Sequence, residues 1–285
     1  MSLRVAAGQD IPAMQTFLGR HADSSMFLRS NLSRHGIGDT EHPDGTTFWI
    51  HETADRLDGV LGVTNGGYLM AQAPDAPASV WKDWASALGP GTIRGMTGED
   101  GQVLCALEAL RLPADFFSIN HAEPLYSLEL DRLADSRDVV RPPTVDDRTV
   151  LTGWYTSLML ETGLVRDPDR ARAEAETRAQ AAETDGTRLL IEDGVPVATV
   201  SLNAQVADMV QVGGVFVPAS HRNRGLGRRV TAARLVESRA LGARKAVLFS
   251  NNDAASRGYE AIGFDLVGAY RVAMLKAPYK LGETT

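Results

Sequence analysis

A short segment rich in glycine and arginine carries the clearest chemical signal in the sequence. Residues 215–229 read VFVPASHRNRGLGRR, a pattern that predicts the end of a strand, a turn and the start of a long helix. A helix N-terminus exposes N–H groups and carries partial positive charge, and both suit a phosphate. Glycines at positions 225 and 227 let the backbone approach an anion closely. The segment therefore predicts a loop that binds a phosphate or diphosphate.

Known anion-binding loops differ in the residues that follow their glycines. A nucleotide-binding P-loop ends in Gly-Lys-Ser/Thr, whereas arginine follows Gly227 here. A dinucleotide fingerprint requires glycine or alanine where Val230 stands. The pattern that remains is Arg222-x-x-Gly225-x-Gly227. A turn that only starts a surface helix is the alternative interpretation.

A second motif follows one predicted strand later. Residues 252–264 read NDAASRGYEAIGF, with Asn252, Ala255, Tyr259, Gly263 and Phe264 at fixed spacing. Together the two motifs resemble those of the GNAT superfamily of N-acyltransferases, and the resemblance covers about residues 139–275. The predicted bulge at the glycine pair 213–214 fits the same family, whose members separate two parallel strands there, although a bulge also merely curves a sheet.

The resemblance implies acetyl-CoA as co-substrate and an N-acetyltransferase that uses direct attack by an amine. By position it implies a cofactor site formed by Val215, Phe216, Val217, Arg222, Asn223, Arg224, Gly225, Leu226, Gly227, Arg228, Asn252 and Ala255. It implies that Tyr259 gives a proton to the departing thiolate. A thiol has a pKa of about 8.5 and a phenol about 10, so a phenol beside the sulfur can donate as the carbon–sulfur bond breaks. The alternative is that Tyr259 packs in the core near Ile262.

Other reactive side chains give weaker signals. The attacking amine must lose a proton, and the candidate bases are Glu161, Asp208 and His221, each of which also has a purely structural interpretation. Cys105 is the only cysteine and lies in an apolar run, which favours a core position. The six histidines show no metal-binding spacing, so no metal is expected.

Periodicity predicts the same order of elements in each half of the chain, as a duplicated domain would. In the C-terminal half we expect strands at residues 139–141, 187–191, 195–202, 209–217, 246–249 and 264–275, with helices at 149–162, 168–183, 226–240 and 253–262. In the N-terminal half we expect strands at residues 3–6, 48–52, 60–63, 68–71, 92–96 and 125–130. We expect one helix that starts at about residue 11 and three more at 25–34, 79–88 and 99–110. Asp58-Gly59 and Asp193-Gly194 are both predicted hairpin turns.

The implied fold class is α/β (α+β), with two tandem GNAT-like domains, each a mixed, mostly antiparallel twisted sheet flanked by helices. A proline pair and a charged run near Ser136 predict the boundary, which gives domains 1–136 and 137–285. The segment 72–78 of the first half has no glycine pair and no arginine. We therefore expect a degenerate N-terminal domain and a catalytic C-terminal domain.

The composition limits which kinds of binding partner and which cellular compartment we expect. The net charge of −7 disfavours general binding to nucleic acid. No apolar run is long enough for a membrane span and no signal peptide is recognisable, so we expect a cytoplasmic monomer or homodimer that does not bind membranes. The expected acceptor is a small-molecule, peptide or protein amine. The competing hypothesis is a non-catalytic acyl-CoA-binding sensor or interaction module.

Overall fold

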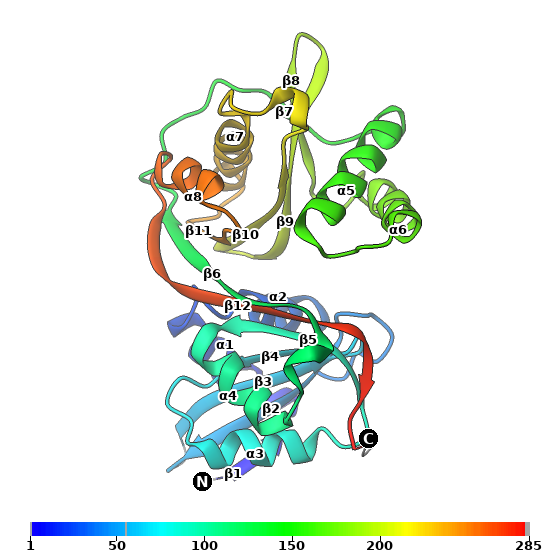
Figure 1. Ribbon diagram of the computed structural model, residues 1–285. Helices are drawn as coiled ribbons and strands as arrows, with labels where there is room; N and C mark the ends of the chain where they lie inside the picture. Colours follow the sequence, from blue (N-terminus) through cyan, green and yellow to red (C-terminus); the bar gives the residue numbers. More distant parts are fainter. Residues whose placement is uncertain (1, 55, 283–285) are drawn as a thin grey trace. The chain divides into compact units, whose positions relative to one another are not determined.

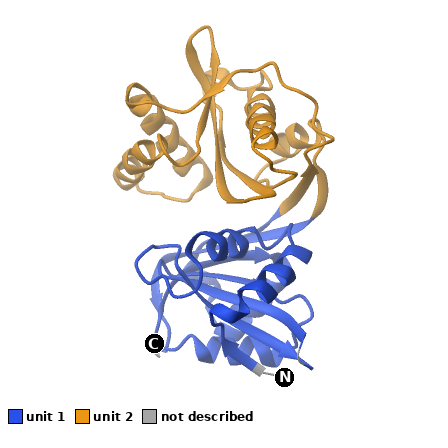
Figure 2. Ribbon diagram, turned by 180° about the vertical axis from the view of Figure 1, so that it is seen from behind, with its two compact units in different colours: residues 1–123, 268–285 blue, residues 124–267 orange. Residues whose placement is uncertain are grey.

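The computed structural model describes residues 2–54 and 56–282. Contacts divide the chain into two compact units, each of which is a mixed sheet flanked by helices (Figures 1 and 2). Unit 1 combines the residues up to Glu123 with those from Gly268 onward, and unit 2 is Pro124–Val267. The predicted α/β class, with two sheet-and-helix units, is confirmed.

Unit 2 has the strand order β6-β11-β10-β9-β8-β7. Strands β10 and β11 run parallel, and the other described pairs in this unit are antiparallel. The strands are β6 (Phe117–Glu129), β7 (Val140–Arg141), β8 (Arg188–Glu192), β9 (Val195–Val206), β10 (Met209–Phe216) and β11 (Lys245–Phe249). The helices are α5 (Arg148–Thr162), α6 (Pro168–Ala181), α7 (Leu226–Ala240) and α8 (Asp253–Glu260).

Unit 1 repeats this plan with the order β1-β2-β3-β4-β5-β12 and a parallel pair at β4 and β5. Its strands are β1 (Ser2–Val5), β2 (Thr46–Thr53), β3 (Arg56–Thr64), β4 (Tyr68–Gln72), β5 (Thr92–Glu99) and β12 (Asp265–Lys280). Its helices are α1 (Ile11–Arg20), α2 (Met26–His35), α3 (Ala78–Ala87) and α4 (Asp100–Leu110).

The last strand of each half of the sequence pairs with the sheet formed mainly by the other half. Strand β6 comes from the N-terminal half and pairs antiparallel with β11, with Leu125 opposite Phe249. Strand β12 ends the sequence and pairs antiparallel with β5, with Tyr270 opposite Glu99. The compact units therefore differ from the division at residue 136, which stays a prediction about where the sequence repeats.

A repeated ion pair supports the duplication. Arg4 holds Asp10 through two hydrogen bonds of 2.8 and 2.9 Å, and Asp10 also accepts the N–H of Ala7. Arg141 holds Asp147 in the same way at 2.6 and 2.9 Å, and Asp147 accepts the N–H of Thr144. These arginine hydrogen bonds lower the pKa of both aspartates to about 2. Each pair fixes the turn that leads into the first helix of its repeat.

Two apolar clusters cover opposite faces of the unit 2 sheet. One contains Leu190 and packs β8–β11 against α7 and α8. The other contains the neighbouring Leu189 and packs against α5 and α6. Successive residues of a strand point to opposite faces, so α7 and α8 cover one face and α5 and α6 the other (Figure 1).

Several local predictions meet their test here. Asp193 and Gly194 have φ angles of 50° and 79°, which confirms the β8–β9 turn. The turn predicted at Asp58-Gly59 is wrong, because both residues lie inside β3. They form a bulge opposite His51, whose ring bonds Asp58, and a Cβ on Gly59 would lie only 3.1 Å from that of Ala73.

The predicted core position of Cys105 is also wrong, because its side chain is exposed. Helix α4 buries Val103, Ala106 and Leu107, and these positions turn Cys105 to solvent. In the described part of the chain, no helix is long and apolar enough to cross a bilayer.

Candidate active site at the separated strands of unit 2

The parallel strands β10 and β11 part before either ends. Their pairing covers only Met209 to Gln211 of β10, against Lys245 to Val247 of β11. Strand β10 continues to Phe216, with irregular register against β9 at the glycine pair. The predicted separation at residues 213–214 is thus present. It leaves the backbone of residues 212–216 unpaired with β11 and available to an extended ligand.

The glycine-arginine loop follows directly after β10. A 3₁₀ turn at Ala219–His221 leads to Asn223 and Gly225, which both adopt left-handed backbone angles, with φ of 62° and 72°. Gly225 is the N-cap of α7, and no side chain in the described residues caps this helix. A Cβ on Gly227 would meet nothing closer than 3.8 Å. The loop therefore presents N–H groups that no side chain caps, beside the guanidinium of Arg228, which fits an anion.

The loop arginines divide into paired and unpaired groups. Arg222 bonds Glu161 of α5 at 2.7 and 2.8 Å, Arg224 bonds Glu192, and Arg229 bonds both Glu192 and Asp138. Arg228 pairs with no carboxylate among the described residues, and its guanidinium lies over Gly225. Arg222 and Arg224 therefore hold the loop in place, while Arg228 has its charge available to a ligand.

The three predicted residues at the end of β10 and the first of α7 have distinct roles. Phe216 and Leu226 are buried in the two clusters on opposite faces of the sheet. Val215 and Val217 are half-buried and pack against the α7 cluster. Their side chains anchor the strand end and the helix start, so only their backbone groups are available to a ligand.

The second motif lies beside the loop because α8 follows β11. Asn252 caps α8, and its Oδ1 accepts the N–H of Ala255 at 2.9 Å. Gly258 lies against Arg228, with 3.8 Å between the Arg228 Cβ and a Cβ placed on the glycine. Both motifs thus meet at the carboxyl ends of the parallel strands, where open α/β sheets bind ligands.

Tyr259 is 8% exposed and packs edge-on against Phe264, with ring centroids 6.0 Å apart. It belongs to the α7-side cluster, and Ile262 packs against the same cluster. This packing agrees with the alternative interpretation of Tyr259, while proton donation by the hydroxyl stays a prediction.

The three candidate bases lie in different places. Glu161 is half-exposed and engaged by Arg222. Asp208 precedes β10, about 26 Å along an extended strand of eight residues from Phe216. The Nδ1 atom of His221 contacts the Ser220 hydroxyl at 2.8 Å at the surface of the loop. The geometry gives Glu161 a positioning role and sets Asp208 apart from the loop.

A depression of about 510 Å³ adjoins the first turn of α7. Its lining includes Arg228 and Arg229, the carboxylates of Asp135 and Asp138, and the apolar side chain of Ile262. It offers cationic, acidic and apolar surface next to the loop.

Sequence reasoning missed the polar residues that face the glycine pair. The Asn203 side chain occupies the space that a Cβ on Gly213 would need. Arg178 of α6 and Ser201 of β9 both approach Gly214, which has a φ of 58°. The signal was the alternation of Ser201 and Asn203 along β9, which places both on one face.

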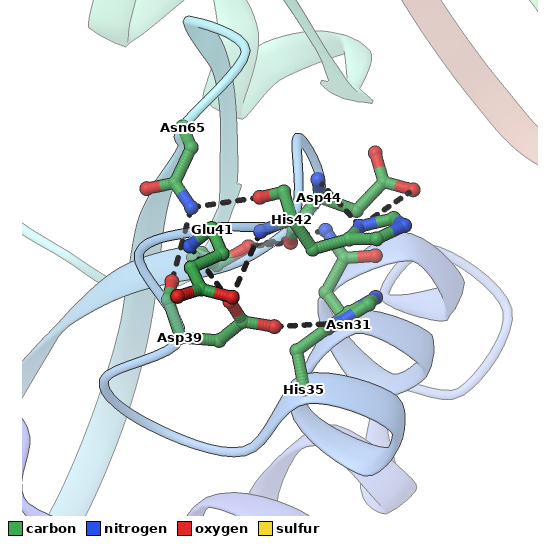
Figure 3. A network of polar contacts seen from close by, with 8 residues as sticks. Asn31, His35, Asp39, Glu41, His42, Asp44 and Asn65 are labelled. Carbon is green, nitrogen blue, oxygen red and sulfur yellow. Dashed lines mark hydrogen bonds and ion pairs between the residues drawn. The ribbon is translucent and has the colours of Figure 1, made fainter.

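A separate polar cluster lies in unit 1, where His35, His42 and Asp44 bring potential ligand atoms within 4.8 Å of one another (Figure 3). The two imidazole rings stack at 4.2 Å with planes only 22° apart. An imidazole binds a metal in its own plane, so two nearly parallel rings do not converge on one ion. His42 Nδ1 also accepts the N–H of Asp44, and Asp39 organises the loop by accepting the N–H groups of Glu41 and His42. The cluster is a loop-ordering network.

Comparisons with known proteins identify the family of the region that holds both motifs. Residues 151–264 match the model of the acetyltransferase (GNAT) family, a span that includes both motifs. No curated protein sequence matched the chain.

Solved structures share the fold over the whole chain. An acetyltransferase from the GNAT family of Colwellia psychrerythraea is 12% identical with a TM-score of 0.50, covering 96% of this chain and all of its own. A GCN5-related N-acetyltransferase from Sphaerobacter thermophilus is 14% identical, with a TM-score of 0.55 and coverage of 98% and 95%. A tandem GNAT protein from the clavulanic acid biosynthesis pathway is 13% identical, with a TM-score of 0.53 and coverage of 100% and 99%. Residues 151–264 therefore belong to the GNAT acetyltransferase family, whose general activity is acyl transfer, and the chain as a whole has the tandem GNAT fold.

Proposed function

We propose that unit 2 transfers an acetyl group from acetyl-CoA to an amine. The observation that supports this most is the early separation of β10 from β11, directly beside the uncapped N-terminus of α7. A diphosphate placed on the N–H groups at Gly225 and Gly227 would have Arg228 beside it. The pantetheine arm would pair with the backbone of residues 212–216, and the depression next to Arg228 would take the nucleotide end.

The chemistry assigned to this chain is positioning and proton transfer. Backbone N–H groups at the glycine pair orient the thioester carbonyl and stabilise the charge that develops on its oxygen. The amine nitrogen forms the new carbon–nitrogen bond while the carbon–sulfur bond breaks, and the departing sulfur takes the proton of Tyr259. The amine loses its own proton to water, and a proton from solvent restores the Tyr259 phenol.

Cofactor binding is the first test. Thermal unfolding with acetyl-CoA at 100 times its Kd should show a stabilisation of about 2.7 kcal/mol. No shift at millimolar acetyl-CoA would contradict the proposal.

Substitution of Tyr259 tests catalysis. We expect Tyr259→Phe to lower kcat about 100-fold with the Kd for acetyl-CoA unchanged, because phenylalanine keeps the packing on Phe264 and removes only the donor. Thiol release over a panel of amines measures this. Tyr126→Phe is the matched control, because it removes another buried phenol, which bonds Glu260 on the helix that carries Tyr259. A protein that binds acetyl-CoA tightly and acetylates no amine would instead support the non-catalytic sensor.

A further inference from the structure

One arginine lies directly over the bulge that separates the strands. Arg178 extends from α6, and its guanidinium is 2.9 Å from the position of a Cβ on Gly214. The Ser201 hydroxyl is 3.0 Å from the same position. Only glycine leaves room for these two groups and also accepts the φ of 58° at this position.

The charge of Arg178 has no carboxylate partner among the described residues. Its neighbours on α6 behave differently, since Arg170 pairs with Glu174 at 2.7 Å and Arg172 with Glu176 at 3.3 Å. Arg178 is half-buried and stacks on the ring of Tyr155 at 4.6 Å. An aromatic face fixes a guanidinium while leaving its edge free for an anion.

Tyr155 gives an independent indication of a ligand. Its side chain is fully buried, and its hydroxyl has no hydrogen-bond partner in the described part of the chain. Buried hydroxyls are nearly always bonded, so one left unsatisfied beside a free guanidinium indicates polar atoms supplied from outside the chain.

Arg178 lies on the side of the sheet opposite the start of α7. Helix α6 and Tyr155 belong to the cluster on the α5–α6 face, whereas the start of α7 packs on the other face. The gap that forms where β10 and β11 separate connects the two faces of the sheet. A cofactor bound by the α7 loop would therefore present its acyl end toward Arg178, where the acceptor must approach.

We propose that the acceptor is an amine that also carries a carboxylate, as an amino acid does, and that Arg178 binds that carboxylate. This inference rests on the proposed function. The guanidinium forms two parallel hydrogen bonds to the carboxylate. The acceptor amine, held over Gly214, forms the carbon–nitrogen bond as the carbon–sulfur bond breaks. Arg178 fixes the acceptor and exchanges no proton.

The test uses matched acceptors, each an amino acid and its carboxamide, with acetyl-CoA as donor. We expect wild-type protein to prefer the carboxylate form, and Arg178→Gln to raise its KM about 10- to 100-fold, as expected for lost hydrogen bonds between charged groups. The KM for the carboxamide should stay unchanged, which shows that the variant is folded. Arg178→Lys should restore part of the preference, and Arg172→Gln, on the exposed side of α6, should change neither value.

Two outcomes would overturn the inference. One is equal use of both acceptor forms by the wild-type protein. The other is an effect of Arg178→Gln on an acidic acyl donor such as succinyl-CoA in place of the acceptor, which would put the carboxylate on the acyl group. Calorimetric binding of the amino acid to the CoA-loaded protein gives a readout without turnover. Failure of acetyl-CoA itself to bind would identify a failure of the proposed function, not of this inference.

Discussion

Each unit has one parallel strand pair at an equivalent place, but the pair stays hydrogen-bonded to its end in unit 1 and separates early in unit 2. In unit 1, β4 and β5 stay paired to Ala71 and Gly98, one residue before β4 ends. The next N–H, that of Ala73, is taken by the Gln102 side chain at 2.5 Å. In unit 2, β10 runs on to Phe216 after its pairing with β11 ends at Gln211. Unit 1 has therefore closed the gap that unit 2 keeps open.

One helix position accounts for much of this difference. Glu99 caps α4 and Asn252 caps α8, each through its side chain. Gln102 and Ala255 both stand three residues after their cap. Gln102 bonds the end of the β4 strand through its side-chain oxygen, whereas Ala255, which packs on the α7-side cluster, has no polar side chain to do so. The loss of a binding site in unit 1 thus involves an added side chain as well as a missing loop.

The most direct test of this difference is to place the glutamine of unit 1 at the equivalent position of unit 2. We expect Ala255→Gln to weaken acetyl-CoA binding on the order of 100-fold, because the longer side chain overfills the gap. Glutamine is a good helix former, so α8 should persist. Isothermal titration calorimetry measures the affinity, with Ala254→Gln, one residue away on the exposed side, as control. Unchanged affinity in a folded Ala255→Gln variant would show that the ligand does not pass α8.

The reverse substitution tests unit 1. Gln102→Ala should lower the free energy of unfolding by about 2 kcal/mol, because it leaves the N–H of Ala73 buried without an acceptor. Chemical denaturation measures this, and Glu108→Ala on the exposed side of α4 is the control. Binding should stay at one acetyl-CoA per chain, since unit 1 still lacks the loop. A second molecule bound would mean that Gln102 alone had closed a working site.

Acid should affect the two units alike through their repeated ion pair. The pKa of Asp10 and of Asp147 is lowered to about 2, so each carboxylate stabilises the fold fully above about pH 5 and less as the pH falls through 4 toward 2. Asp147→Asn should remove about 1–2 kcal/mol at pH 7, a value reduced by the solvent exposure of Arg141. Stability measured from pH 7 to 2 should fall less steeply in the variant. An equal slope would contradict the role of this pair.

The smallest expected effect concerns the ion pair between Glu161 and Arg222 in unit 2. Both side chains are half-exposed, so Glu161→Gln should change stability by less than about 1 kcal/mol. Its pH–rate profile should keep the wild-type shape. Loss of the acidic limb, where activity rises with pH as a base is deprotonated, would instead make Glu161 the general base.

Local signals in the sequence predicted the parts of the site that depend on local backbone chemistry. The turn at Asp193-Gly194 and the start of α7 after Gly225 both follow from residue types at fixed spacing. The partner of a strand does not follow in that way. The sequences of β6 and β12 both predict strands, but they do not indicate which sheet each strand joins.

Contacts between distant elements explain the remaining differences. Arg178 occurs in a helix where arginines and glutamates alternate at pairing distance, so its lack of a partner shows only in the fold. The pair Asp58-Gly59 has the composition of a turn, yet close packing against Ala73 decides its conformation. In both cases tertiary contacts override the local preference.

The pairing of β12 with β5 has a consequence for synthesis on the ribosome. Domains generally fold as units while the chain is being made, with the N-terminal one first. Here the first sheet lacks its neighbour to β5 until residues 270–280 have been translated, long after β5 itself. The nascent chain must therefore keep that edge of β5 protected from other strands until β12 has been made.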